Sequence, residues 1–182
     1  MVVDEVAKNI YVIENFFTEE ECDRYVAESE KCGYSTATVN MEKGERVIDD
    51  VRNNKRILYT DKELADKVWK KLDGLGPQKI GNCVAIGLNE LFRFYKYEPG
   101  QLFKKHIDES FIRSEFEASY FTFMIYLNDG YVGGETKFET TNIKGKKGMA
   151  LVFLHSLAHE GAEVESGIKY VLRTDIMYRL AE

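Results

Sequence analysis

The stretch SYFTFMIYLNDG, residues 119–130, decides the fold. Aromatic residues run through it as far as Asn128, Asp129 and Gly130, which together form a strong turn signal. It therefore predicts a long strand that ends in a tight turn. The segments that follow are each introduced by glycine and have the length of strands: GETKFET (134–140), GMALVFL (148–154) and GIKYVLRTDIMYRL (167–180).

The segment ELFRFYKYEPG, residues 90–100, predicts another strand upstream. Its side chains alternate between two faces, and the pattern breaks at Pro99-Gly100. One face is predicted to carry Leu91, Arg93, Tyr95 and Tyr97, and the other Phe92, Phe94 and Lys96. From residue 89 onward the chain requires strands and no helix.

The N-terminal part predicts a strand followed by a helix. NIYVIENFF (9–17) has the composition of the strand. TEEECDRYVAESEKCG (18–33) is typical of a helix that begins with a capping box of Thr18 and Glu21 and ends at Gly33.

A second helix is predicted further along. It is expected to begin with a capping box of Thr60 and Glu63 and to end at Gly74. Its buried side is expected to consist of Leu64, Val68, Trp69 and Leu72. The polar segment 35–56 between the helices lacks periodicity, and it predicts a loop with at most one strand.

Two helices followed by several short strands predict a mainly β protein, a sandwich or jelly roll with the helices packed on one face. At 182 residues the chain suits a single domain. Within it, residues 1–80 are expected to supply the N-terminal strand and the supporting helices. Residues 81–182 are expected to form the jelly-roll core with the functional site.

Composition excludes several classes of protein. A net charge of −6 and a pI near 5.3 argue against a broad surface for nucleic acid or for an anionic membrane, although a local basic patch such as VRNNKRI (51–57) remains compatible. Cys22, Cys32 and Cys83 have no CxxC spacing and are expected to be reduced thiols. The N-terminus lacks the pattern of a signal peptide. We therefore expect a soluble, cytoplasmic protein whose partner is a small molecule or a peptide, in an oligomeric state that stays open.

The positions of the three histidines predict a metal site. His106 and Asp108, in KKHID, have the spacing that places both side chains on one face of a strand. The mouth of a jelly roll is lined by inward-facing side chains, and a metal there needs a third ligand from a distant strand. His155 and His159 both lie in such a segment, and the residues alone leave both open. Two histidines with one carboxylate form the facial triad typical of non-haem Fe(II) oxygenases.

Four segments together resemble the Fe(II)- and 2-oxoglutarate-dependent dioxygenase superfamily, in particular its prolyl 4-hydroxylase-like branch. They are YKYEPGQLFKKHID (95–108), TFMIYLND (122–129), GGETKF (133–138) and HEGAEVESGIKYVLRTDIMY (159–178). The resemblance implies a double-stranded β-helix, a cupin-like jelly-roll barrel. It also implies Fe(II), 2-oxoglutarate as cosubstrate and dioxygen, with ascorbate as a candidate auxiliary reductant. The implied activity is hydroxylation of an unactivated C–H bond, with release of succinate and carbon dioxide.

The resemblance assigns the iron ligands residue by residue. His106 and Asp108 match the first two ligands. His159 matches the third, because Lys169 lies ten residues after it, where the family keeps a basic residue. His155 has an acidic residue at that spacing, which would repel a carboxylate, and it is expected to pack in the barrel or to line the pocket.

The distal carboxylate of 2-oxoglutarate requires a fixed cation. Lys169 and Arg173 lie at even spacing on one predicted strand, so both can point inward. Lys169 is the preferred anchor because its position matches that of the family. The alternative role for Arg173 is a structural ion pair, with Asp175 or with a residue of another strand. Tyr97 and Tyr126 match tyrosines that line the cosubstrate pocket in this branch.

One alternative to a hydroxylase stays open, a non-catalytic jelly-roll module that binds a metal or a ligand. Asp108 favours a hydroxylase over a halogenase, because the halogenases of this superfamily lack the carboxylate. The substrate is not specified: peptidyl proline, free proline and other amino acids all remain. Segments 35–56 and 108–119 are expected to border the mouth of the pocket, and their mixed charge favours a polar substrate or a peptide.

Overall fold

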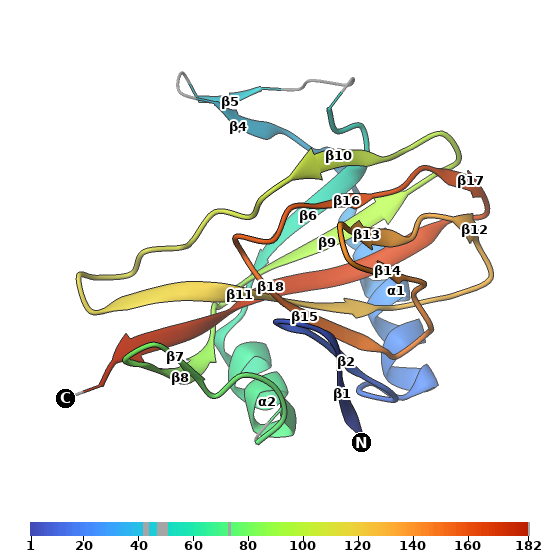
Figure 1. The fold of residues 1–182 in the computed structure, drawn as a ribbon. Helices are drawn as coiled ribbons and strands as arrows, with labels where there is room; N and C mark the ends of the chain where they lie inside the picture. The colour runs from blue at the N-terminus through green and yellow to red at the C-terminus, as the bar shows by residue number, and fades with distance from the viewer. Residues whose placement is uncertain (42–43, 47–50, 73, 182) are drawn as a thin grey trace.

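The computed structural model describes residues 1–41, 44–46, 51–72 and 74–181. A ten-stranded sheet forms its centre (Figure 1). Eight of its strands follow one another in the order β1 (Val3–Ala7), β2 (Ile10–Ile13), β15 (Ala150–Leu154), β11 (Glu117–Tyr126), β18 (Lys169–Leu180), β9 (Leu91–Tyr97), β6 (Lys55–Thr60) and β3 (Ser35–Thr36). Off this path, β8 (Cys83–Leu88) pairs with β18 and with β7 (Lys79–Ile80).

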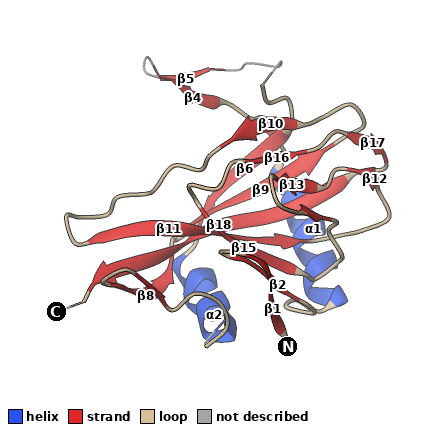
Figure 2. Ribbon diagram, in the orientation of Figure 1, coloured by secondary structure: helices blue, strands red, loops and turns tan. Residues whose placement is uncertain are grey.

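A smaller sheet lies over one face of the large sheet, and the two helices lie on the other face (Figure 2). The smaller sheet has the order β10 (Phe103–His106), β16 (His159–Gly161), β13 (Thr136–Phe138) and β14 (Asn142–Ile143). Two further pairs are β12 (Val132–Gly133) with β17 (Val164–Ser166), and β4 (Val39–Met41) with β5 (Gly44–Arg46). The helices are α1 (Glu19–Cys32) and α2 (Lys62–Leu72).

Alternation along the strands builds two separate hydrophobic clusters. Phe92 and Phe94 of β9 point towards the helices, where they pack with apolar residues of α1 and α2. Tyr95 and Tyr97 of the same strand point towards the smaller sheet and pack with Phe138 of β13. The period-two pattern of residues 90–100 is thereby confirmed.

The start of α1 follows the sequence prediction, and the start of α2 does not. Thr18 and Glu21 form the predicted capping box at α1, and Gly33 ends the helix with a φ of 80°. At α2 the predicted box of Thr60 and Glu63 is wrong. Thr60 is the last residue of β6, and the carboxylate of Asp61 accepts the hydrogen bond from the Leu64 backbone nitrogen at 2.9 Å.

Segment 35–56 contains more strands than predicted. It holds β3, β4, β5 and the first residues of β6, so the expectation of at most one strand is wrong. Strands β3, β4 and β5 are two or three residues long and mostly polar, which leaves no alternating apolar pattern to recognise. Residues 42–43 and 47–50 of the segment lie outside the described part of the chain.

Strands from both sides of residue 80 share the ten-stranded sheet, and the single-domain organisation stays a prediction. After α2, the described residues form strands and turns with no further helix, as the sequence predicts. Neither described helix is long and apolar enough to cross a membrane.

Candidate functional site

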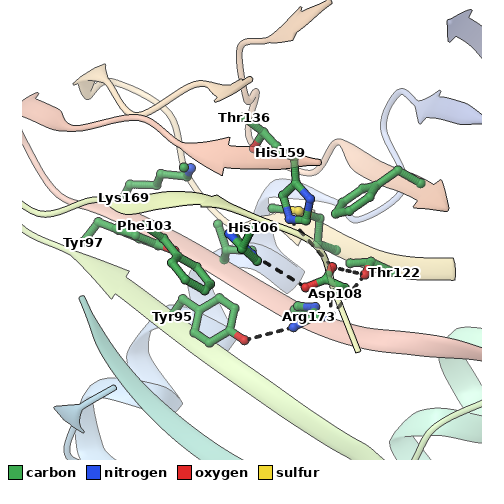
Figure 3. A pocket seen from close by; sticks show the side chains of 14 residues that line it. Tyr95, Tyr97, Phe103, His106, Asp108, Thr122, Thr136, His159, Lys169 and Arg173 are labelled. Carbon is green, nitrogen blue, oxygen red and sulfur yellow. Dashed lines mark hydrogen bonds and ion pairs between the residues drawn. The ribbon is translucent and has the colours of Figure 1, made fainter. Parts of the chain in front are cut away.

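A pocket opens between the smaller sheet and the pocket-facing side of the large sheet (Figure 3). Its wall combines aromatic rings, two histidines, one carboxylate, two threonines and two cations. Strands β9, β11 and β18 of the large sheet and β10, β13 and β16 of the smaller sheet contribute to it. Groups able to bind a metal and groups able to bind an anion therefore share one cavity.

Strand pairing brings two histidines together. His106 at the end of β10 lies directly opposite His159 at the start of β16. Asp108 adds a carboxylate whose two oxygens each lie 3.7 Å from an Nε2, Oδ1 from that of His106 and Oδ2 from that of His159. The three candidate ligand atoms lie within 4.8 Å of one another. An ion between them would have two imidazole nitrogens and one carboxylate oxygen as ligands.

Backbone contacts fix the tautomers of both histidines. His106 Nδ1 lies 2.8 Å from the carbonyl oxygen of Lys104, and His159 Nδ1 lies 3.0 Å from that of Leu157. A carbonyl only accepts hydrogen bonds, so each Nδ1 carries the proton and donates it. Each Nε2 then has a free lone pair on the side of Asp108, as metal-binding histidines require.

The protonation states also suit a metal. Burial lowers the pKa of His106 to about 4, with a smaller contribution from His159. Burial likewise lowers the pKa of His159. For Asp108 burial acts to raise the pKa, but Arg173 and His159 outweigh it and hold the pKa well below its usual range. At neutral pH the site therefore presents two neutral imidazoles and an ionised carboxylate.

Asp108 does not lie in a strand, so the strand expected through both ligands is wrong. Strand β10 ends at His106, and Asp108 lies in the irregular segment that leads to β11. Contacts from elsewhere in the fold hold it. Its backbone nitrogen donates to the carbonyl oxygen of His155 at 3.1 Å, and its Oδ2 accepts a hydrogen bond from Thr122 Oγ1 and an ion pair from Arg173 Nη2 at 3.1 Å.

Lys169 reaches the pocket from the start of β18 and is 2% exposed. Its Nζ donates to the carbonyl oxygen of Gly134 at 2.6 Å and lies 5.1 Å from the ring centre of Tyr97 and 5.5 Å from that of Tyr126. Among the described residues, no carboxylate forms an ion pair with it. Burial lowers its pKa to about 8, so the ammonium group is the main form at neutral pH.

Arg173 lies on the same face of β18 as Lys169. Its guanidinium group contacts two carboxylates. Its Nη2 lies 3.1 Å from Asp108 Oδ2 and 3.2 Å from Asp175 Oδ1. Its Nη1 lies 3.4 Å from the hydroxyl oxygen of Tyr95. The two cations of β18 thus differ in their surroundings: among the described residues Arg173 forms two ion pairs with carboxylates and Lys169 forms none, with Glu135 acting on it only at longer range.

The two tyrosines expected at the cosubstrate lie at different depths. Tyr97 lines the pocket. Tyr126 is fully buried and is absent from the described lining; its hydroxyl group forms a 2.7 Å hydrogen bond with Oγ1 of Thr136, which does line the pocket. Tyr126 therefore lies behind Thr136 and beneath the ammonium group of Lys169.

His155 lies outside the described lining of the pocket and is 4% exposed. Its Nδ1 lies 3.5 Å from Ser110 Oγ, and its Nε2 lies 3.5 Å from Asp175 Oδ1. The structure thus places His159, not His155, beside His106 and Asp108. His155 packs behind the site.

Several pocket residues were not singled out from the sequence. Thr122 lies four residues before Tyr126 on β11, so the alternation of that strand was a signal that could have placed it on the pocket face. Phe103 stacks on the ring of His106 with their centres 3.6 Å apart. Arg52, in segment 35–56, lies over the rings of Phe103 and Tyr95 at 4.3 and 4.6 Å. No local pattern marks Phe103 or Arg52, because their positions depend on pairing between distant segments.

The two segments expected at the mouth differ in character. Segment 35–56 approaches the pocket through Arg52. In segment 108–119, Asp108 lines the pocket, and further along Phe111, Ile112 and Phe116 are exposed at 41%, 73% and 58%. The second segment therefore presents large apolar side chains to solvent as well as charges.

Comparisons with known proteins agree with this geometry. A family model described as the 2OG-Fe(II) oxygenase superfamily matches residues 92–174. Prolyl 4-hydroxylase 1 of Arabidopsis thaliana is 25% identical over 190 aligned residues, which cover 88% of this chain and 66% of that protein. The chain thus spans slightly less than two thirds of the length of this curated relative.

Solved structures confirm the architecture. The viral collagen prolyl hydroxylase vCPH of Paramecium bursaria Chlorella virus-1, in complex with 2OG, is 24% identical, with a TM-score of 0.66 over 95% of this chain and 97% of that chain. A Trichoplax adhaerens prolyl hydroxylase, in complex with a hypoxia inducible factor peptide fragment, is 17% identical, with a TM-score of 0.70 over 92% and 83%. At these identities the likeness bears on the fold, which is the double-stranded β-helix expected from the sequence.

Proposed function

Because residues 92–174 match the model of the 2OG-Fe(II) oxygenase superfamily and the chain is similar to prolyl hydroxylases, we propose that it is a dioxygenase that hydroxylates an unactivated C–H bond. The observation that carries the proposal is the convergence of His106, Asp108 and His159 with both Nε2 atoms free. A non-catalytic module that binds an organic ligand has no need for two neutral imidazoles and an ionised carboxylate at one point of a pocket, and a metal-binding module has no need for the buried cation Lys169 beside them.

The proposed iron ligands are His106 Nε2, His159 Nε2 and a carboxylate oxygen of Asp108. When bound, Fe(II) activates dioxygen for the oxidation of a C–H bond while 2-oxoglutarate is converted to succinate and carbon dioxide. Three protein ligands leave open positions for the 2-oxo acid and for dioxygen. The carbonyl oxygens of Lys104 and Leu157 keep both rings in the tautomer that this task requires.

Lys169 is the proposed anchor for the distal carboxylate of 2-oxoglutarate. Its ammonium group forms no ion pair with a described carboxylate, Glu135 acts on it only at longer range, and a backbone carbonyl holds it in position. Tyr97 and Thr136 line the pocket beside it, and Tyr126 supports Thr136 from behind. A charge-assisted contact contributes about 1.5–3 kcal/mol. Lys169→Ala is therefore expected to raise the KM for 2-oxoglutarate by roughly ten- to a hundredfold, at about 1.4 kcal/mol per decade.

Several classes of substrate fit the proposed reaction. The relatives reported above are named prolyl hydroxylases, so proline in a peptide is the first class that we propose, with free proline and other amino acids next. Of the exposed apolar residues in segment 108–119, Phe111 lies three residues after Asp108 and offers an apolar contact to a peptide.

Two measurements test the function. Anaerobic addition of Fe(II) and 2-oxoglutarate to the purified protein is expected to give the weak visible charge-transfer band of an iron-bound 2-oxo acid. A binding module that does not take up the 2-oxo acid would give no such band. Absence of the band would therefore refute the proposal. A screen for succinate release, with ascorbate in the buffer, then compares proline-containing peptides with free amino acids. Turnover of free amino acids alone would eliminate the peptidyl-proline class.

A further inference from the structure

Asp108 requires support that its own segment does not provide. A residue within a strand has its direction set by its neighbours in the sheet, but Asp108 lies beyond the end of β10. A carboxylate there has several rotamers, and metal ligands are held in place by partners that contact their remaining atoms. Asp108 Oδ2 accepts a hydrogen bond from Thr122 and an ion pair from Arg173, and it also lies 3.7 Å from His159 Nε2.

These two donors occupy one oxygen of the carboxylate. Thr122 Oγ1 donates to Oδ2, and Arg173 Nη2 lies 3.1 Å from the same atom. A carboxylate oxygen has two lone pairs in its plane, so Oδ2 is fully used. Oδ1 lies 3.7 Å from His106 Nε2 and accepts no hydrogen bond from the residues that the structure describes. The contacts thus select one oxygen and one rotamer for ligation.

Arg173 is itself held by a buried carboxylate. Asp175 is 1% exposed, and its Oδ1 lies 3.2 Å from Arg173 Nη2. Its Oδ2 lies 3.4 Å from Arg93 Nη1. An unpaired carboxylate would be costly at this depth, so the two arginines and Asp175 form one network. His155 closes the network, because its ring lies beside Asp175 while its carbonyl oxygen accepts from the Asp108 backbone nitrogen.

We propose that Arg173 and Asp175 are positioning residues for the metal: Arg173 orients Asp108 so that Oδ1 faces the ion, and Asp175 keeps Arg173 in that orientation. The inference rests on the proposed function, since it takes Asp108 as a ligand. It excludes Arg173 as the anchor of 2-oxoglutarate. Arg173 already forms ion pairs with two carboxylates, whereas Lys169 forms none with the described residues and feels Glu135 only at longer range.

Mn(II) is the probe for the test, because it binds the same ligand types as Fe(II) and is stable in air. Calorimetric titration of the metal-free protein, without 2-oxoglutarate, compares wild type with Arg173→Lys and Asp175→Asn. Lysine keeps the charge but has a single nitrogen on a flexible stem, so it cannot keep the Nη2 contacts to Asp108 and Asp175 together with the Nη1 contact to Tyr95. Arg173→Lys is expected to weaken Mn(II) binding by about ten- to a hundredfold, the usual cost of losing an outer partner of a metal ligand. Asp175→Asn is expected to weaken it in the same direction and by less.

Two controls separate positioning from other roles. Lys169→Met is expected to leave the Mn(II) dissociation constant within about threefold of wild type while it weakens 2-oxoglutarate binding. A purely structural role for Arg173 would lower the melting temperature of the metal-free protein and leave the Mn(II) dissociation constant unchanged. Asp175→Asn preserves the shape of the side chain and serves as the second test if Arg173→Lys does not fold.

The outcomes are distinguishable. If wild type binds Mn(II), Asp108→Ala does not, and both positioning variants bind like wild type, the inference is wrong and the proposed function stands. If Arg173→Lys weakens 2-oxoglutarate binding alone, Arg173 is the anchor and the inference is again wrong. If wild type itself binds no Mn(II), the proposed function fails and the inference fails with it.

Discussion

The two faces of the ten-stranded sheet are built from the same strands but from different chemistry. Towards the helices, β11 and β18 present Phe121, Phe123, Leu172 and Ile176, all at most 2% exposed. Towards the smaller sheet, the alternate positions carry Thr122, Lys169, Arg173 and Asp175. One face is an apolar core, and the other combines a second apolar cluster with buried charges in fixed contacts. A single strand can therefore serve stability with one set of side chains and binding with the other.

The strongest test of this division is Asp108→Ala on the pocket side. Loss of a metal ligand is expected to abolish turnover, because two histidines alone do not complete the triad. The fold is expected to remain, since the apolar face is untouched. Succinate release measures the first effect and circular dichroism the second. Full activity in this variant would show that the triad is misassigned.

The next largest contrast separates two histidines four residues apart. His159→Ala is expected to lose bound iron, because its Nε2 faces Asp108. His155→Ala is expected to keep most of it, because the backbone carbonyl that holds Asp108 remains. Metal content after anaerobic loading and desalting gives the comparison. Loss of iron from the His155 variant alone would move the ligand by four residues.

A smaller effect concerns the pH dependence of Lys169. Burial lowers its pKa to about 8, and the anion binds the protonated form. The KM for 2-oxoglutarate is therefore expected to be flat below pH 8 and to rise by about tenfold per pH unit above it, because binding then requires uptake of a proton. Lys169→Arg is the matched control, since arginine keeps its charge over this range. Equal slopes in both proteins would assign the pH effect to another group.

The smallest effect on chemistry is expected from the helix side. Leu172 lies between Val171 and Arg173 in the chain but points into the apolar core, where it is 1% exposed. Leu172→Ala is expected to lower the free energy of unfolding by about 2–5 kcal/mol, the usual cost of such a cavity. Metal affinity and KM are expected to stay within about twofold, below 0.5 kcal/mol. Urea denaturation and Mn(II) titration measure the two; a large loss of metal affinity would show that the faces are coupled.

The sequence predicts the strands best where one face is apolar. Alternation gave β9, and the aromatic run ending at Asn128 gave β11, because a half-buried strand imposes a period of two on its residues. The capping box of α1 was also visible, because its two residues lie three apart in the chain and bond within one helical turn. At α2, Thr60 and Asp61 are both good caps, and only the end of β6 decides between them.

The site was predictable as a set of residue types and not as a geometry. Spacing and resemblance pointed to His106, Asp108 and Lys169, and the structure brings their side chains into one pocket. The place of Asp108 outside a strand was missed, because the end of β10 depends on its pairing with β16. The contact between Arg173 and Asp108 was missed for a similar reason, since it joins segments far apart in the chain.

The carbonyl oxygen of Gly134 has a consequence for the rate at which ligands arrive. Gly134 has a φ of 68°, and a Cβ there would lie 3.3 Å from Lys169 Cδ, so this close approach of the backbone suits glycine. A carbonyl holds the ammonium group in place without cancelling its charge, which leaves a positive potential at this end of the pocket before any ligand enters. Such a potential raises the association rate of anions and is screened by salt. A dianion should therefore enter this pocket fastest at low ionic strength, against the net negative charge of the protein as a whole.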